Sequence, residues 1–321
     1  MQAVILAAGC GTRLMPLTRV RSKAMLPILG VPIIERIIAD IAACGINDFI
    51  IVAQPQDKDL TNHFQRMARL DANLQIVHQT EPRGMAHALK CAAPYIQGDF
   101  LLSACDNLVP ADSLARMLSF WGGQQALKAL LALMPVSAEK ANRSAVVELD
   151  GNQVRRIVEK PPPEGIVTGI ASLPLYCFTP RLLDFLPLVK RSPRGEYELQ
   201  DAIQMLIERE GHVHGFTVPE RMTLTSPDDL LAINRHCLLE EQARGGSLLV
   251  EPQSVGVNTN LREPLWVGPG THIGANCTIG PLVYIEGDCT VGDNTSLRES
   301  VVLRGTTISS EADIYKKVLP E

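Results

Sequence analysis

Residues 3–18 read AVILAAGCGTRLMPLT, and this stretch decides the fold. Its first four residues, Ala3 to Leu6, form an apolar run that is typical of a buried parallel strand. The small residues and glycines that follow let the backbone approach a ligand, and glycine permits positive φ, so successive N–H groups can point into one concavity. Such a concavity binds phosphate oxygens, and Arg13 and Lys23 add positive charge beside it. The sequence therefore predicts a phosphate-binding loop directly after the first strand.

This loop has neither the Gly-Lys-Ser/Thr ending of a P-loop nor the GxGxxG pattern of dinucleotide-binding folds. Its ordered residues, completed by Lys23 and Pro27, resemble the signature of the sugar-1-phosphate nucleotidyltransferases, the nucleotide-sugar pyrophosphorylases. The resemblance implies that Arg13 and Lys23 are catalytic. It also implies that the nucleotide is bound by Leu6, Ala7, Ala8, Gly9, Gly11, Thr12 and Arg13. The alternative is an ordinary turn from strand to loop with two surface cations.

The composition favours a protein of about two domains that acts on a small charged substrate. The chain has 321 residues, of which 46% are hydrophobic, and a formal net charge of -5. A negative protein with a local basic pocket fits a phosphorylated small molecule better than nucleic acid. The apolar runs are too short to span a bilayer, and the chain starts with a strand rather than a basic, apolar leader, so we expect a cytoplasmic protein. Eight cysteines without a Cys-x-x-Cys pair indicate reduced thiols and no zinc site.

Strand and helix patterns alternate after the loop. This alternation predicts a parallel sheet with right-handed crossovers, and ligands in such sheets bind beyond the carboxyl ends of the strands. We therefore expect an α/β fold with a Rossmann-like mixed, mostly parallel sheet flanked by helices, forming a catalytic domain over residues 1–243. The strand patterns cover residues 49–52, 74–77 and 99–104, and the helical patterns cover residues 32–43 and 57–70.

An aliphatic residue recurs every six positions near the end of the chain. The positions are Val267, Ile273, Ile279, Ile285, Val291 and Leu297, and after a slip Val302, Ile308 and Ile314. A six-residue period predicts a parallel β-helix with one aliphatic residue turned inward on each face. Some members of the resembled family carry a left-handed hexapeptide β-helix, which implies a short one of three to four coils within residues 244–321. Its expected role is packing and oligomerisation, so a homo-oligomer is expected.

The loop after the strand at 74–77 contains a candidate base-reading pair. Gln79 offers a donor and an acceptor together, which suits the edge of a pyrimidine, and Gly84 lets the backbone reach the base. In the resembled family a Gln and a Gly five positions apart read uracil or thymine, and this spacing is kept here. The alternative for Gln79 is a loop amide bonded to its own turn. His87 is interpreted as helix packing or surface.

Asp106 directly follows the strand at 99–104 and is the candidate metal ligand. Mg²⁺ prefers oxygen ligands and is often held by one or two carboxylates together with substrate phosphates. The resemblance implies that Asp106 holds Mg²⁺, although a helix-capping Asp before Pro110 is the alternative. The family's second carboxylate aligns with Thr223, and hydroxyl oxygen is a poorer Mg²⁺ ligand than carboxylate. Asp228 and Asp229 are expected to cap the helix that follows.

Two further motifs resemble the family's sugar-phosphate pocket. Glu159 and Lys160 open a Glu-Lys-Pro motif, which implies that the carboxylate accepts from sugar hydroxyls and that the ammonium pairs with the sugar phosphate. Arg194 opens RGEYELQD, residues 194–201, and could help to hold the same phosphate. The alternatives are a surface ion pair at a strand end and a structural loop arginine.

The resemblance implies Mg²⁺-dependent transfer of a nucleotidyl group from UTP or dTTP to a sugar-1-phosphate, with glucose-1-phosphate as the expected sugar. The attacking phosphate oxygen is already anionic, so catalysis reduces to positioning and charge stabilisation. The departure at Thr223 leaves open a catalytically weak regulatory homologue. An acyltransferase on the β-helix is a further alternative, although His272 is the only histidine in the repeat.

Overall fold

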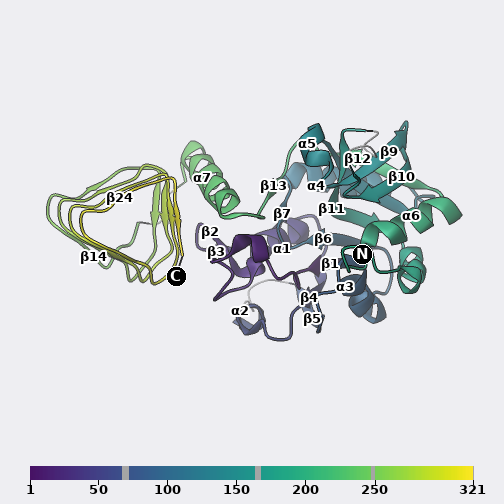
Figure 1. Ribbon diagram of the computed structural model, residues 1–321, viewed down its shortest axis with the longest axis horizontal. Helices are drawn as coiled ribbons and strands as arrows, with labels where there is room; N and C mark the ends of the chain where they lie inside the picture. The colour runs from purple at the N-terminus through teal and green to yellow at the C-terminus, as the bar shows by residue number, and fades with distance from the viewer. Residues whose placement is uncertain (67–71, 163–167, 247–249, 321) are drawn as a thin grey trace. The chain divides into compact units, whose positions relative to one another are not determined.

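The computed structural model describes residues 1–66, 72–162, 168–246 and 250–320, so the last four residues of the expected helix at 57–70 and Pro163 lie outside the described residues. Contacts within the chain divide it into two compact units. Figure 1 colours the chain by residue number, from purple at the N-terminus to yellow at the C-terminus. The first unit comprises Met1–Cys10 and Arg36–Met222, and the second comprises Gly11–Glu35 and Thr223–Glu321. The division of the chain into domains at residues 243 and 244 stays a prediction.

A nine-stranded mixed sheet forms the first unit. Its strands are β1 (Gln2–Leu6), β4 (Asp48–Ala53), β5 (Asn73–His78), β6 (Phe100–Ala104), β8 (Ala129–Pro135), β9 (Ala145–Asp150), β10 (Gln153–Glu159), β11 (Ile170–Phe178) and β12 (Val213–Thr217). They lie in the order β5-β4-β1-β6-β11-β8-β12-β10-β9. Strands β5, β4, β1 and β6 are parallel, β11 runs antiparallel to β6 and β8, and β9 and β10 form a hairpin. The predicted Rossmann-like mixed sheet is confirmed.

Helices cover this sheet, and their apolar faces build its core. The helices are α1 (Ile33–Ala43), α2 (Lys58–Arg66), α3 (Met85–Ala92), α4 (Ala111–Gly122), α5 (Ala138–Ala141) and α6 (Leu199–Arg209), with the 3-10 helices η3 (Ala93–Tyr95) and η5 (Pro180–Leu188). Leu89 of α3 and Ile203 of α6 pack in one core with Val4 and Leu6 of β1. Ile5, whose side chain points to the other face of β1, is also fully buried. Burial on both faces fixes β1, and therefore the start of the loop that follows it.

The second unit combines the segment after β1 with the C-terminal part of the chain. Its elements before the repeat are η1 (Thr12–Leu14), η2 (Lys23–Met25), the hairpin of β2 (Pro27–Ile28) and β3 (Val31–Pro32), and α7 (Pro227–Ala243). Among the described residues outside the repeat, the remaining elements are the short strands β7 (Asn107–Leu108) and β13 (Met222–Thr223). Among the described residues, no helix combines the length and the hydropathy that crossing a bilayer requires.

The hexapeptide repeat forms a parallel β-helix, drawn in green to yellow in Figure 1. Its strands are β14 (Ser254–Val255), β15 (Asn260–Leu261), β16 (Leu265–Val267), β17 (His272–Ile273), β18 (Thr278–Ile279), β19 (Val283–Ile285), β20 (Thr290–Val291), β21 (Ser296–Arg298), β22 (Val301–Val302), β23 (Thr307–Ile308), β24 (Asp313–Tyr315) and β25 (Val318–Leu319). They stack as three parallel sheets, β14-β17-β20-β23, β15-β18-β21-β24 and β16-β19-β22-β25. The predicted β-helix is confirmed.

The slip in the repeat is one shorter coil. Ile273 pairs with Val291, 18 positions later, but Val291 pairs with Ile308, only 17 positions later. Both pairs remain in register, and all three side chains are buried in the same apolar core. A coil one residue shorter is therefore accommodated in the turns, while the inward aliphatic column continues.

A capping box starts helix α7. The side chain of the N-cap residue Ser226 accepts from the N–H of Asp229, and Asp229 Oδ2 accepts from the N–H groups of Ser226, at 2.8 Å, and Thr225, at 2.7 Å. Burial raises the pKa of Asp229, but these hydrogen bonds outweigh it and hold the pKa below its ordinary value. The predicted capping role is confirmed for Asp229, whereas Asp228 lies exposed in the first turn.

Asp229→Ala should destabilise the protein by about 1 kcal/mol, because it removes the acceptor of these N–H groups. A carboxylate whose pKa is lowered by folding stabilises the fold above its unfolded pKa, and this contribution is lost as the pH falls through the folded value. The difference between wild type and variant in urea unfolding should therefore be largest at neutral pH and vanish in acid. Asp228→Ala is the matched control, and an equal loss in both variants would contradict the capping role.

Candidate active site

The first part of the predicted phosphate loop is anchored at the end of β1. Leu6, Ala7 and Ala8 are buried, and Gly9 is exposed. The N–H of Ala7 donates to the carbonyl of Val52 at 2.7 Å, which continues the ladder between β1 and β4. The side-chain amide of Gln54 donates to the carbonyl of Ala8 at 2.8 Å. The backbone is thus fixed up to Ala8 and turns toward solvent immediately afterwards.

The second part of the loop closes on itself within the second unit. The hydroxyl of Thr18 donates to the carbonyl of Gly11 at 3.0 Å. Gly11 has a φ of +59°, and a Cβ there would lie 3.0 Å from Thr18 Cγ2 and 3.4 Å from Lys23 Cβ. The structure therefore brings Gly11 and Lys23 together, and the positive φ at the close approach favours glycine. Thr12 and Arg13 have exposed side chains in η1.

The carboxamide of Gln79 is buried and oriented by two acceptors. Its Nε2 donates to the carbonyl of Gly84 at 3.2 Å and lies 2.9 Å from Nδ1 of His87. The carbonyl of Gly84 can only accept, so the NH₂ group of Gln79 must face it. The second N–H of the same group then donates to His87, whose Nδ1 acts as acceptor. Both amide protons are used, and Oε1 remains as the atom that can accept from a ligand.

His87 fixes this orientation because it is neutral. Burial lowers the pKa of His87, and the positive charges of Arg83 and Lys90 lower it further, against the opposing charge of Glu81. A neutral imidazole can accept at Nδ1, whereas an imidazolium cannot. The interpretation of His87 as packing or surface missed this contact. Its signal in the sequence was the position of His87 in the first turn of the helix that follows Gly84, close to the loop.

Gly84 is required by the backbone that packs against it. Its φ is +102°, and a Cβ there would lie 2.6 Å from the carbonyl oxygen of Tyr197. That oxygen accepts from the N–H of Ala86 at 3.0 Å, while the N–H of Tyr197 donates to the carbonyl of Arg83 at 2.7 Å. These bonds fix the start of α3, and with it the acceptor that Gly84 offers to Gln79.

Asp106 lies half-buried just beyond β6, near a half-buried arginine, Arg221, that the sequence did not single out. Arg221 donates from Nη1 to Oδ1 of Asn107 at 3.2 Å. Burial lowers the pKa of Arg221, and the negative charge of Asp106 acts in the opposite direction. A guanidinium therefore shares the surroundings of the candidate metal ligand. Nothing in the sequence around Arg221 distinguishes it from a loop arginine.

A single carboxylate matches a Mg²⁺ ion that is held mainly by substrate phosphates. In the part of the chain that the structure describes, no cluster of three or more His, Cys, Asp or Glu side chains could hold a metal by itself. Mg²⁺ keeps several waters and is often held by one or two carboxylates plus phosphate oxygens. Asp106 supplies one carboxylate, the smallest number that such a site uses.

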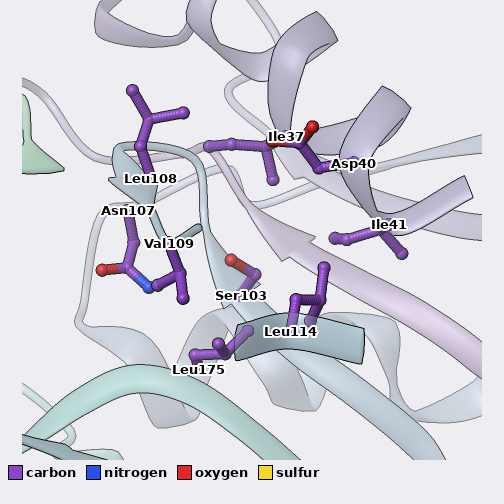
Figure 2. A pocket seen from close by; sticks show the side chains of 9 residues that line it. All are labelled: Ile37, Asp40, Ile41, Ser103, Asn107, Leu108, Val109, Leu114 and Leu175. Carbon is purple, nitrogen blue, oxygen red and sulfur yellow. The ribbon is translucent and has the colours of Figure 1, made fainter. Parts of the chain in front are cut away.

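A small cavity of about 20 Å³ lies beside this region (Figure 2). Asp40, Ser103 and Asn107 contribute polar atoms to its otherwise apolar lining, and burial raises the pKa of Asp40, against the opposing charge of Arg36. The amide nitrogen of Asn107 is buried without a hydrogen-bond partner. The cavity has room for about one water molecule, which could pair with this nitrogen, and it is far too small for a nucleotide.

The predicted sugar-phosphate residues form one ion-pair cluster. Oε1 of Glu159 lies 3.4 Å from Nζ of Lys160 and 3.5 Å from Nη2 of Arg194. The same nitrogen of Arg194 lies 2.8 Å from Oε1 of the buried Glu198, which also accepts from the hydroxyl of Ser192 at 2.8 Å. Burial raises the pKa of Glu159, while Lys160 and Arg194 oppose the rise. Arg194 is thus held between two carboxylates, whereas Lys160, whose side chain is 45% exposed, has more access to a ligand.

Comparison with known proteins assigns both parts of the chain. The family model "Nucleotidyl transferase" matches residues 2–237, and "Bacterial transferase hexapeptide (six repeats)" matches residues 270–305. A UTP–glucose-1-phosphate uridylyltransferase of Bacillus subtilis (strain 168) is 30% identical over 236 residues, which cover 64% of this chain and 80% of that protein. AglF of Haloferax volcanii, also a UTP–glucose-1-phosphate uridylyltransferase, is 35% identical over 211 residues, which cover 64% of this chain and 84% of that protein.

A solved structure shares the fold. The structure of a UDP-glucose pyrophosphorylase complexed with UDP-glucose aligns with a TM-score of 0.67, at 21% identity, over 74% of this chain and 98% of that one. Likeness at this identity shows the fold alone, but the family match covers well over half of the sequence. The predicted family is confirmed: the chain is an enzyme of the nucleotidyl transferase family, related to sugar-1-phosphate nucleotidyltransferases, and it carries a hexapeptide-repeat β-helix.

Proposed function

We propose that the protein transfers a uridylyl or thymidylyl group from UTP or dTTP to a sugar-1-phosphate, with glucose-1-phosphate as the sugar substrate and pyrophosphate as the leaving product. The observation that carries the choice of nucleotide is the orientation of Gln79, whose two amide protons are used by Gly84 and His87. Relatives that bear the name UTP–glucose-1-phosphate uridylyltransferase support the sugar and the reaction.

Gln79 selects the base through its remaining acceptor. Uracil and thymine carry an N–H donor at N3, from which Oε1 of Gln79 can accept a hydrogen bond. Cytosine carries an acceptor at N3, so two acceptors would face each other and the buried oxygen would lose its partner. A buried polar group left without a partner costs about 1–3 kcal/mol, which is enough for a clear preference for UTP or dTTP over CTP.

Positively charged side chains beside the phosphates provide the catalysis. Arg13 binds the leaving pyrophosphate and stabilises the charge that develops on it, and Lys23 contacts the phosphates between nucleotide and sugar. The attacking oxygen of the sugar phosphate is anionic, so no general base is needed. Lys160 pairs with the sugar phosphate, and Arg194 orients Glu159 toward the sugar hydroxyls, a division that follows from the contacts of Arg194 with two carboxylates.

Asp106 is the residue that would hold Mg²⁺. When bound, the ion offsets negative charge on the phosphate oxygens and helps to orient them. The guanidinium of Arg221 adds a fixed positive charge in the same surroundings.

Asp106→Asn should weaken Mg²⁺ binding, so that the rate saturates only at higher Mg²⁺ concentration, because an amide oxygen binds the ion less tightly than a carboxylate. The measurement is the initial rate as a function of Mg²⁺ concentration, and we expect the half-saturating concentration to rise about tenfold or more. Asp112→Asn, which changes an exposed carboxylate in the first turn of α4, is the control. An unchanged Mg²⁺ titration would place the metal ligand elsewhere.

His87→Ala should raise the KM for UTP about 2- to 10-fold, because one hydrogen bond that orients Gln79 is lost. In the wild type, KM should also rise as the pH falls through the pKa of His87, which lies below its ordinary value of 6.5, since the imidazolium cannot accept. UTP itself titrates in acid, so the informative quantity is the difference between wild type and variant. That difference should shrink in acid, and His78→Ala, an exposed histidine at the end of β5, should retain the wild-type profile.

A catalytically weak regulatory relative is the competing function, and it is favoured by Thr223 at the position of an expected carboxylate. A panel of nucleoside triphosphates against sugar-1-phosphates decides between the two, with released pyrophosphate as readout. Turnover with UTP or dTTP and glucose-1-phosphate supports the proposal. Binding of these nucleotides without pyrophosphate release would support the regulatory alternative.

A further inference from the structure

The segment that carries the predicted phosphate contacts belongs to the same compact unit as helix α7 and the β-helix. This grouping is unexpected from the sequence, because residues 11–35 and the repeat are separated by more than 200 positions. Three sets of contacts inside the second unit explain it.

The first contact is a buried asparagine of helix α7. Oδ1 of Asn234 accepts from the N–H of Leu29 at 3.0 Å, and its Nδ2 donates to the carbonyl of Pro27 at 3.3 Å. Asn234 is 1% exposed, and Nδ2 also donates to the carbonyl of Leu230 in its own helix. Asn234 of α7 therefore both accepts a hydrogen bond from the β2–β3 hairpin and donates one to it.

The second contact joins the tip of the same hairpin to the β-helix. The N–H of Gly30 donates to the hydroxyl of Tyr284 at 3.1 Å. Gly30 has a φ of +80°, and a Cβ there would lie 2.7 Å from Cζ2 of Trp266. Trp266 and Tyr284 are neighbours in the stacked strands β16 and β19, so the hairpin tip sits on one face of the β-helix.

The third contact is an ion pair two residues before Lys23. Nη1 of Arg21 lies 2.7 Å from Oε1 of Glu286, and the two side chains are only 12% and 9% exposed. Oε2 of Glu286 accepts from the N–H of Arg304 at 2.9 Å, which fixes the carboxylate to the next coil. A shielded pair of this kind holds its geometry far better than an exposed one, and Nε of Arg304, 3.8 Å from Oε1, further restrains the carboxylate of Glu286.

We propose that the β-helix positions the phosphate loop through Glu286, and that Arg21 and Glu286 are positioning residues for Lys23. The inference rests on the proposed function for its catalytic consequence. Arg21 is two positions from Lys23, and Lys23 packs against Gly11 at the other end of the loop, so the anchored guanidinium limits the movement of the whole closed segment. The β-helix is then part of the phosphate-binding machinery as well as a packing module.

The test compares Glu286→Gln with Asp313→Asn in the full-length protein. Asp313 forms an exposed β-helix ion pair with Arg298 at 3.0 Å, so the control also removes one carboxylate charge. We expect Glu286→Gln to speed amide hydrogen exchange within residues 11–26 and to lower kcat about tenfold, because small displacements of a positioning group cost large factors in rate. Asp313→Asn should change neither.

A double-mutant cycle with Arg21→Gln separates positioning from a general loss of stability. If the pair acts as a unit, the double variant loses no more kcat than either single variant, and the far-UV circular dichroism of all three matches the wild type. Arg21→Gln also keeps the inference testable if Glu286→Gln fails to fold. Unchanged exchange in residues 11–26 overturns the tether whatever the activity of the wild type, whereas a wild type without nucleotidyl transfer refutes the proposed function only.

Discussion

Arg13→Ala should lower kcat at least about 100-fold, equivalent to about 2.7 kcal/mol of transition-state stabilisation. The side chain of Arg13 is exposed in η1, directly after Gly11, and its charge is proposed to act on the leaving pyrophosphate. Negative charge grows there as the bond to the α-phosphorus breaks, so the loss should fall on kcat more than on KM. The measurement is steady-state pyrophosphate release with UTP and glucose-1-phosphate.

Arg19→Ala is the matched control for this variant. Arg19 is an exposed arginine of the same segment, six positions later, and removing it makes the same change in net charge. Its kcat should stay within about twofold of the wild type, and both variants should unfold at the wild-type temperature, because neither side chain is buried. A near-wild-type kcat for Arg13→Ala, or an equal loss in both variants, would remove Arg13 from the mechanism.

The sequence predicted well those features that depend on periodicity or on a long ordered motif. The apolar run at Ala3 to Leu6 is a strand buried on both faces, and the aliphatic residues of the repeat line the core of the β-helix. Even the slip after Leu297 has a simple structural counterpart in one shorter coil. Such features can be predicted from the sequence because the burial of each residue follows from its spacing along the chain, and the same spacing recurs in every turn, strand or coil.

The contacts that orient side chains could not be read in this way. His87 accepts from Gln79 because the carbonyl of Gly84 leaves the amide no other orientation, and this follows only from coordinates. Arg221 reaches Asn107 from 114 positions away, and Glu286 reaches Arg21 from 265 positions away. No local pattern marks either partner, because long-range pairing depends on topology rather than on spacing.

Gln79→Ala should lower kcat/KM for UTP about 5- to 150-fold, the range that corresponds to about 1–3 kcal/mol for a buried hydrogen-bonding group. The variant removes the acceptor that is proposed to face the base, so activity with CTP, which Oε1 of Gln79 is proposed to disfavour in the wild type, should not fall. The ratio of kcat/KM for UTP to that for CTP is therefore the decisive quantity, and it should fall toward unity. Discrimination between uracil and cytosine would then be lost.

Gln75→Ala is the matched control, since Gln75 is an exposed glutamine four positions earlier on β5. It should leave the UTP to CTP ratio unchanged. Comparison with His87→Ala tests the underlying geometry, because that variant keeps the acceptor of Gln79 but frees its amide to rotate, so its ratio should lie between those of the wild type and Gln79→Ala. An equal loss for UTP and CTP in Gln79→Ala would mean that Gln79 supports the fold of the loop around Gly84, and base selection would then have to come from other residues.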